Sequence, residues 1–364
     1  MNETTMNVKI VLLPGDGIGP EVIAEAGLLL ATLADEHQLS LDIQTELIGG
    51  AAIDACGDPL PEKTLHNCQD ADAILLGAVG GPKWSDPNAT VRPEQGLLAI
   101  RKALGLFANL RPVKVHPKLL SASPLKPEYL EGVDLMVVRE LTGGSYFGEK
   151  QEGDDFASDM CTYSREEIER VVLRAGQIAR DRSGRLTMID KANVMATSRL
   201  WRKVTDEIMQ QHFPDLQYET ILVDAAAMYL ISQPSRFDVI VTENMFGDIL
   251  TDEASMLVGS IGMLPSASLG AGKCGIFEPI HGSAPDIAGK GIANPFGMLA
   301  SVAMMFDYSL GLKEIAQQIE QAIWQCVSEG ECTADLGGTL TTAEAGAAVR
   351  RRLSESGESQ LAYG

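Results

Sequence analysis

Short apolar runs alternate with amphipathic helical segments along much of the chain, and this alternation constrains the fold more than any other feature. Apolar runs predict buried strands at 8–13, 73–76, 135–138, 186–189, 221–223 and 239–241, and period-two alternation predicts another at 41–47. Helical spacing predicts helices over 22–33 and 166–181, the second opened by a capping box of Ser164 and Glu167. Strands that alternate with helices indicate an α/β architecture with a largely parallel sheet.

The size and charge of the chain narrow the class of protein. Its 364 residues predict two domains or one elaborate α/β unit. The net charge of −21 argues against nucleic acid and anionic membranes as partners, although a local group of cations could still bind a small anion. The polar residues 1–7 and the absence of a long apolar stretch favour a cytoplasmic protein, and six scattered cysteines favour reduced thiols.

Polar residues follow three of the predicted strands directly. These are Arg139-Glu140, Asp190-Lys191 and Asp224. Ligands of α/β sheets bind beyond the carboxyl ends of the strands, so a site is expected there. The alternative is that these strands simply end in solvent, where polar residues are common.

A glycine-rich turn at 15–20 resembles the dinucleotide-binding fingerprint but does not match it. The third glycine of that fingerprint would stand at Pro20. The segment could equally be a plain turn, with Pro20 in the first turn of a helix. Two other glycine-containing stretches, 77–82 and 281–286, could approach a ligand closely. Asp286 could accept hydrogen bonds from ribose hydroxyls and would repel a 2′-phosphate, which favours NAD over NADP.

Three arginines form the candidate cation group: Arg101, Arg111 and Arg139. Guanidinium groups bind carboxylates in a two-pronged geometry, so three that converged would suit a dicarboxylate. The alternative is that each is a surface ion-pair partner that contributes little.

Two aspartates, Asp248 and Asp252, stand four residues apart and would share one face of a helix. Like charges at that spacing repel, and a hard dication such as Mg²⁺ would compensate, with Asp224 as a possible third ligand. The alternative is a solvated acidic helix face. No histidines have zinc-site spacing.

Tyr146 and Lys191 are the candidate proton-transfer groups. Tyr146 lies between glycines that would let it project over a ligand, and Lys191 follows a strand. A lysine in a dry site can act as a base, and a tyrosine can donate a proton. The alternatives also remain open: Tyr146 could be an ordinary packing residue, and Lys191 could be a solvated charge.

Taken together, these segments resemble the β-decarboxylating dehydrogenase family, which includes enzymes acting on isocitrate, isopropylmalate, homoisocitrate and tartrate or D-malate. The resemblance covers about residues 9–338 and is carried by 15–21, 139–144, 191–193, 244–252 and 281–286. It implies the isocitrate/isopropylmalate dehydrogenase-like fold, which is not of the Rossmann type: two α/β domains and a large mixed, mostly parallel sheet. Residues 1–106 with 259–364 would form the domain with most NAD-binding loops, and 107–258 the domain with the dimer interface and the metal and substrate residues.

Within the family, the segment from Glu94 to Arg101 is similar to that of members acting on isopropylmalate, where two leucines meet the isopropyl group. The resemblance therefore implies oxidative decarboxylation of (2R,3S)-3-isopropylmalate with NAD in leucine biosynthesis. A tartrate or D-malate dehydrogenase and a non-catalytic regulatory subunit are the alternatives. Ser145 departs from the family pattern, which has an aliphatic residue there, and Arg350–Arg352 match nothing assignable and are expected to be solvated.

The resemblance also implies roles for individual residues. Tyr146 would protonate the product carbon, and Lys191 would help remove the hydroxyl proton. Mg²⁺ or Mn²⁺ would bind Asp224, Asp248 and Asp252, and in a homodimer Lys191 and Asp224 would reach the neighbouring subunit's site. The expected substrate contacts are Arg101, Arg111, Arg139, Asp224, Glu94, Leu97, Leu98 and Val194. The expected NAD contacts are Ile18, Gly80, Gly81, Pro82, Asn193, His281, Gly282, Ser283, Ala284, Pro285, Asp286, Ile287 and Asn294.

Overall fold

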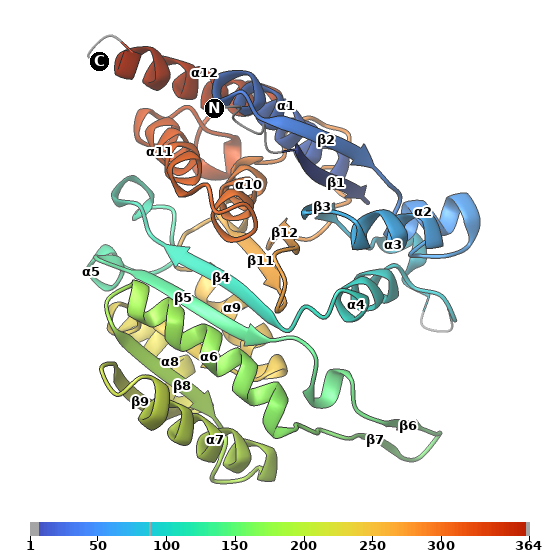
Figure 1. The fold of residues 1–364 in the computed structure, drawn as a ribbon, viewed down its shortest axis with the longest axis vertical. Helices are drawn as coiled ribbons and strands as arrows, with labels where there is room; N and C mark the ends of the chain where they lie inside the picture. The colour runs from blue at the N-terminus through green and yellow to red at the C-terminus, as the bar shows by residue number, and fades with distance from the viewer. Residues whose placement is uncertain (1–6, 87–88, 362–364) are drawn as a thin grey trace, which may run out of the picture. The chain divides into compact units, whose positions relative to one another are not determined.

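The computed structural model describes residues 7–86 and 89–361. They fall into two compact units (Figure 1). The first unit joins the chain up to Gly105 with the chain from Ser260 onward, and the second spans Leu106–Gly259. Each unit is α/β and contributes five strands of mixed, mostly parallel sheet. The predicted α/β class and mixed sheet are confirmed.

In the first unit the strand order is β2-β1-β3-β12-β11. Three neighbouring pairs are parallel, and β11 with β12 is antiparallel. The strands are β1 (Asn7–Gly15), β2 (Ser40–Thr45), β3 (Ala73–Ala78), β11 (Pro265–Leu269) and β12 (Gly275–Pro279). The helices are α1 (Gly19–His37), α2 (Gly49–Cys56), α3 (Glu62–Gln69), α4 (Pro93–Ala103), α10 (Phe296–Tyr308), α11 (Lys313–Glu329) and α12 (Thr342–Leu361).

The core of the first unit forms where α1 and α10 pack against these strands. The apolar positions predicted for the first helix, among them Val22, Leu29 and Leu33, are fully buried. Helix α11 packs on α10, and α12 packs on α11 and α1. Three short 3-10 turns complete the unit: η1 (Pro82–Trp84), η5 (Ile261–Met263) and η6 (Ala334–Leu336).

In the second unit the strand order is β4-β5-β10-β8-β9, with β4 antiparallel to β5 and the other pairs parallel. The strands are β4 (Ala108–Lys114), β5 (Asp134–Glu140), β8 (Arg185–Asp190), β9 (Gln217–Leu222) and β10 (Val239–Thr242). A separate hairpin pairs β6 (Lys150–Glu152) with β7 (Ala157–Asp159). The helices are α5 (Pro127–Leu130), α6 (Arg165–Asp181), α7 (Ala196–His212), α8 (Val223–Ser232) and α9 (Asn244–Ser255), with 3-10 turns η2 (Pro117–Leu119), η3 (Gly144–Tyr146) and η4 (Pro234–Arg236).

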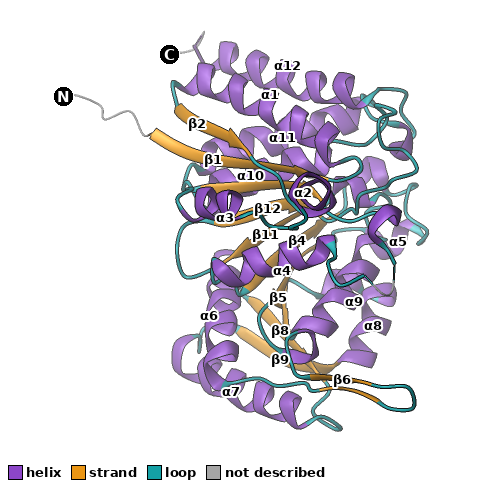
Figure 2. Cartoon of the chain, turned by 90° about the vertical axis from the view of Figure 1, so that its right-hand side faces the viewer, coloured by secondary structure: helices purple, strands orange, loops and turns teal. Residues whose placement is uncertain are grey.

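Helices cover both faces of the second unit's sheet. Figures 1 and 2 show α6 and α7 on one face and α8 and α9 on the other. Helix α6 begins as predicted, because Ser164 accepts a hydrogen bond from the Glu167 amide while the Glu167 carboxylate accepts one from the Ser164 amide. Its apolar face, with Ile168, Val171 and Val172, is completely buried.

Three parts of the structure differ from the sequence expectations or extend them. The strand expected at 221–223 ends at Leu222, and Val223 begins α8, so Asp224 lies in the first turn of a helix. Strands β4, β6, β7, β11 and β12 lie outside the predicted set. The expectation that Arg350–Arg352 are solvated is wrong in part, because Arg350 pairs with Glu25 and Arg352 with two glutamates while both arginine side chains are mostly buried.

Two further observations concern thiols and membranes. Each of the six cysteines is free. Within residues 7–86 and 89–361, we find no helix with the length and apolar character needed to cross a lipid bilayer.

Candidate active site

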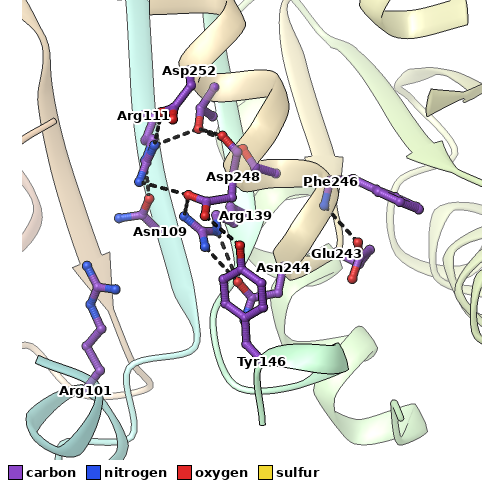
Figure 3. A network of polar contacts seen from close by, with 12 residues as sticks. Arg101, Asn109, Arg111, Arg139, Tyr146, Glu243, Asn244, Phe246, Asp248 and Asp252 are labelled. Atoms are coloured by element: carbon purple, nitrogen blue, oxygen red, sulfur yellow. Dashed lines mark hydrogen bonds and ion pairs between the residues drawn. The ribbon is translucent and has the colours of Figure 1, made fainter. Parts of the chain in front are cut away.

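Arg139 lies at the carboxyl end of β5 and is nearly buried. Its Nε and Nη2 atoms donate to Oδ1 of Asn244, at 3.2 and 2.9 Å, and its Nη1 contacts Asp248 (Figure 3). Strand β5 neighbours β10, and α9 starts shortly after β10 ends, so the sheet order itself brings the arginine to the first turns of α9. The strand-end position noted in the sequence therefore places this side chain in a polar cluster rather than in bulk solvent.

Arg111 reaches the same cluster from β4. Its Nη1 donates to the hydroxyl of Thr251 at 2.6 Å, and its Nε donates to Oδ1 of Asn109 at 2.8 Å. Its guanidinium also lies 3.9 Å from the carboxylate of Asp248 and 3.5 Å from that of Asp252. Asn109 is the register partner of Arg139 across the antiparallel pair, which explains how two arginines on adjacent strands face the same helix.

Asp248 and Asp252 both lie on α9 and share one face, as the spacing predicts. The repulsion expected between them is offset here by Arg111 and Arg139, which contact the pair directly. The side chain of Asp248 is one-third exposed, at 34%, and that of Asp252 is open, at 71%. Carboxylate oxygen atoms therefore remain accessible beside two guanidinium groups.

Tyr146 projects from the turn η3 toward Asp248, as Figure 3 shows. Its hydroxyl donates to Oδ2 of Asp248 at 2.7 Å, and the guanidinium of Arg139 lies 5.7 Å from the centre of its ring. Burial and the hydrogen bond to Asp248 raise the pKa of Tyr146 to about 12. The phenol is therefore protonated at neutral pH and can act as a proton donor.

Lys191 and Asp224 form a second pair in the same unit. Nζ of Lys191 donates to Oδ1 of Asp224 at 2.7 Å, and this bond lowers the pKa of the aspartate. In the described parts of the chain, no hydrogen bond or ion pair joins this pair to Tyr146, Asp248 or Asp252. No three histidine, cysteine or acidic side chains gather as a metal-binding group among those residues either. One chain thus brings together two of the three predicted metal ligands and keeps the third with Lys191.

Asn193 and Val194 follow Lys191 on the same loop, and both are exposed. The amide of Val194 donates to the Lys191 carbonyl, which makes a tight turn after β8. The turn therefore exposes Asn193, a predicted cofactor contact, and Val194, a predicted apolar contact of the substrate, to solvent.

The other predicted substrate contacts lie on α4 of the first unit. Glu94, Leu97, Leu98 and Arg101 occupy successive turns of one helix face. Arg101 makes an ion pair of 2.5 Å with Glu278 on β12, and both side chains are mostly buried. The sequence analysis missed Glu278, because nothing local marks a glutamate on a strand as the partner of an arginine 177 residues away.

The glycine-rich turn at 15–20 organises the predicted cofactor loops of the first unit. The carboxylate of Asp16 is almost buried and accepts hydrogen bonds from the amides of Gly50, Ala51 and Gly80, at 2.7 to 2.8 Å. The amide of Ile18 donates to the carbonyl of Ser283 at 2.8 Å. The turn therefore holds both the 80–82 loop and the 281–287 loop, a role that sequence reasoning did not assign to Asp16.

His281 and Asn294 are buried, whereas Asp286 is exposed. The Nδ1 atom of His281 contacts the Gly282 carbonyl at 2.9 Å, but its buried Nε2 has no hydrogen-bond partner. Burial lowers the pKa of His281, so the ring is neutral at physiological pH. A buried polar atom without a partner is costly, and a bound ligand could satisfy it.

Comparisons with known proteins identify the family of the chain. A family model described as isocitrate/isopropylmalate dehydrogenase matches residues 9–349. The 3-isopropylmalate dehydrogenase of Rhodopirellula baltica is 55% identical over 357 residues, which cover 96% of this chain and 99% of that protein. The enzyme of the same name from Bacillus subtilis is 55% identical over 337 residues, covering 91% and 92%. Among solved structures, isocitrate dehydrogenase from Methylococcus capsulatus gives a TM-score of 0.83 with 33% identity, covering 95% of this chain and 99% of that one.

Proposed function

Because the chain belongs to the isocitrate/isopropylmalate dehydrogenase family, we propose that it oxidises and decarboxylates (2R,3S)-3-isopropylmalate with NAD⁺. The products are 4-methyl-2-oxopentanoate, CO2 and NADH, and the reaction belongs to leucine biosynthesis. The observation that carries the proposal is the convergence of Arg111, Arg139 and Tyr146 on Asp248. Two guanidinium groups suit the carboxylates of the substrate, the phenol can supply a proton, and the carboxylate can hold a dication.

Substrate recognition combines charge with an apolar contact. Arg101, Arg111 and Arg139 bind the carboxylates of the malate moiety, with Asp224 and Glu94 as further polar contacts. Leu97, Leu98 and Val194 form the apolar contact for the isopropyl group. Leu98 and Val194 are exposed in the structure, so each has surface available for a ligand.

The donor set at α9 suits a hard dication. Asp248 and Asp252 offer carboxylate oxygens on one helix face, and Mg²⁺ or Mn²⁺ favours such ligands together with substrate oxygens. Asp224 completes the set from a second copy of the chain. When bound, the dication supplies Lewis acidity to the substrate hydroxyl and its neighbouring carboxylate.

The residues of this chain then handle protons. Lys191 helps remove the proton of the substrate hydroxyl as C2 is oxidised and its hydride passes to NAD⁺, a step in which the lysine must act as the unprotonated amine. Tyr146, a neutral phenol, gives its proton to the carbon that has lost CO2. The arginines hold both carboxylates until the one on C3 leaves as CO2, and they then hold the carboxylate that remains.

The first unit suits NAD⁺, which supplies the hydride acceptor. The contacts proposed are Ile18, Gly80–Pro82, His281–Ile287 and Asn294, with Asn193 from the second unit. The buried, unpartnered Nε2 of His281 supports a ligand at that loop. The exposed carboxylate of Asp286 favours ribose hydroxyls over a phosphate.

We propose a homodimer with shared sites, because among the described residues of one chain no hydrogen bond or ion pair joins Lys191 and Asp224 to the Tyr146 cluster. Helices α8 and α9 pack together and carry exposed apolar side chains, with Met228 and Ile231 on α8 and Ile249 and Met256 along or just after α9. A second copy of the chain would cover these apolar side chains and would also bring its Lys191 and Asp224 to the Tyr146 cluster.

The test is NADH formation by the purified protein with isopropylmalate, followed by ultraviolet absorbance. We expect turnover with Mg²⁺ or Mn²⁺, loss of turnover with EDTA, and recovery on metal addition. D-malate, isocitrate and NADP⁺ serve as matched alternatives and should be poorer. Absence of NADH with isopropylmalate, or faster turnover of D-malate, would refute the assignment.

A further inference from the structure

Tyr163 lies just before α6 and takes no part in the chemistry proposed above, yet it contacts both elements that build the Tyr146 cluster. One is the turn that contains Gly143, Gly144 and Tyr146. The other is the start of α9, where Glu243 and Asn244 lie. The half-buried ring also packs edge-on against Trp201, with 5.4 Å between ring centres and an interplanar angle of 84°.

On the turn side, the ring leaves room only for glycine. A Cβ added at Gly143 would lie 2.4 Å from Cε1 of Tyr163, and one added at Gly144 would lie 2.6 Å from its hydroxyl oxygen. Gly144 also has a φ of +75°, which a residue with a side chain rarely adopts. The amide of Gly144 donates to the carbonyl of Thr162 at 2.9 Å, so the backbone next to Tyr163 holds the same turn.

On the helix side, the hydroxyl of Tyr163 both accepts and donates. It accepts from the amide of Asn244 at 3.0 Å and donates to Oε2 of Glu243 at 3.1 Å. The other oxygen of Glu243 accepts from the amide of Phe246 at 2.8 Å, which caps the N-terminus of α9. One hydroxyl thus connects the cap of α9 with its first residue.

The residues held in this way are those that contact the catalytic group. The Asn244 side chain accepts two hydrogen bonds from Arg139, and its Nδ2 donates to the Gly143 carbonyl. Asp248, one turn further along α9, accepts from Tyr146. The ring of Tyr163 therefore fixes one end of the Tyr146–Asp248 contact, and its hydroxyl fixes the other.

We propose that Tyr163 is a positioning residue that holds Tyr146 in register with Arg139 and Asp248. The role rests on the function proposed above, because it matters for turnover only if Tyr146 is the proton donor. Burial, together with Glu243 and Glu140, raises the pKa of Tyr163 far above its usual range, so the hydroxyl is protonated and can donate at any working pH. A small misplacement of a catalytic group can cost about 100-fold in rate, which makes such a role measurable.

Tyr163→Phe is the direct test, because it keeps the ring against the two glycines and removes only the hydroxyl. We expect kcat to fall about tenfold or more while KM for isopropylmalate stays within about twofold. Tyr218→Phe is the matched control. Tyr218 also donates to a carboxylate, that of Asp206, at 2.8 Å, but no hydrogen bond among the described residues joins it to the turn or to α9, so the kcat of this variant should not change. An unchanged kcat in Tyr163→Phe, or an equal fall in both variants, would overturn the proposal.

A double-mutant cycle with Tyr146→Phe distinguishes positioning of Tyr146 from a general loosening of the protein structure. If Tyr163 acts through Tyr146, the substitution at 163 should have little further effect on kcat once the Tyr146 hydroxyl is absent. Independent, additive losses would show that Tyr163 contributes only through global structure, and would refute its positioning role.

Amide hydrogen exchange gives a readout that does not depend on substrate. The peptide that contains the amides of Asn244 and Phe246, at the start of α9, should exchange faster in Tyr163→Phe than in the wild type or Tyr218→Phe, because the lost hydroxyl contacts Asn244 and Glu243. Unchanged exchange there would refute the holding role even in an active enzyme. A wild-type protein inactive on isopropylmalate would instead refute the proposed function, and the exchange comparison would still decide whether the Tyr163 hydroxyl holds the start of α9.

Discussion

Tyr146 and Arg139 contact different oxygen atoms of one carboxylate, that of Asp248. The phenol donates to Oδ2 and the guanidinium contacts Oδ1. Asp248 is thereby fixed between an acid and a cation, and its position sets where the phenolic proton points.

Replacing Tyr146 with Phe should lower kcat by about 10² to 10⁴, the usual contribution of a positioned acid. Substrate affinity should change little, because the arginines that bind the carboxylates remain. Initial rates give kcat, and calorimetric titration of isopropylmalate into the metal-loaded protein gives affinity. Wild-type turnover in this variant would exclude Tyr146 as the donor.

Mixing two inactive variants tests whether sites are shared. Tyr146→Phe and Lys191→Ala should each be nearly inactive. If one chain supplies Tyr146 and its partner supplies Lys191, random reassociation makes half the dimers hybrid, each with one intact site, and restores about a quarter of wild-type activity. Co-expression with two affinity tags provides the hybrid for assay. No recovery would mean that both groups serve the same chain's site.

Replacing Asp252 with Asn should weaken Mn²⁺ binding at least about tenfold, because the open carboxylate is a proposed ligand. Electron paramagnetic resonance counts free Mn²⁺ directly, without reference to turnover. Asp215→Asn is the control, since Asp215 pairs with Arg180 on an exposed surface. Equal Mn²⁺ affinity in both variants would remove Asp252 from the metal site.

Replacing Asp16 with Asn should raise KM for NAD⁺ more than KM for isopropylmalate. An amide cannot accept all three backbone hydrogen bonds that the carboxylate accepts, so the 80–82 loop should loosen. The free energy of unfolding should also fall by about 1–3 kcal/mol. Asp58→Asn, at an exposed carboxylate that accepts a hydrogen bond from the Leu60 amide, should leave both KM values unchanged.

The pH dependence of stability should reveal Asp238. Burial by itself would raise the pKa of this carboxyl, but hydrogen bonds from Ser183 and Arg182 outweigh burial and hold it below its usual value. A lowered folded-state pKa adds stability above the unfolded value of about 3.9, and this stability is lost as the pH falls through the folded-state value. The difference in unfolding free energy between wild type and Asp238→Asn should therefore shrink below about pH 4 in urea titrations. A constant difference would contradict the assignment.

Local pattern was sufficient for elements whose residues alternate cleanly between buried and exposed. Helix α6 shows its apolar face and its capping box in sequence, and both occur as predicted. Strand β11 reads Pro-Ser-Ala-Ser-Leu, and its two serines are buried all the same. Their burial depends on neighbouring strands, which no short window contains, so this strand was missed.

The same distinction applies to the site. The spacing of Asp248 and Asp252 predicted a shared helix face, which the structure shows. It did not predict that Arg111 and Arg139 would offset their charge, because that depends on the register of β4 against β5. The roles of Glu278 and Tyr163 could not be predicted for the same reason, since each contacts residues that are distant in sequence.

The close approach of Tyr163 to Gly143 and Gly144 has a consequence for divergence. An alanine at either glycine would collide with the ring, and a smaller side chain at 163 would leave the turn unsupported. Positions 143, 144 and 163 should therefore covary among relatives. A relative with a larger residue at either glycine should have a smaller residue at 163. Other contacts would then have to hold its proton donor in position.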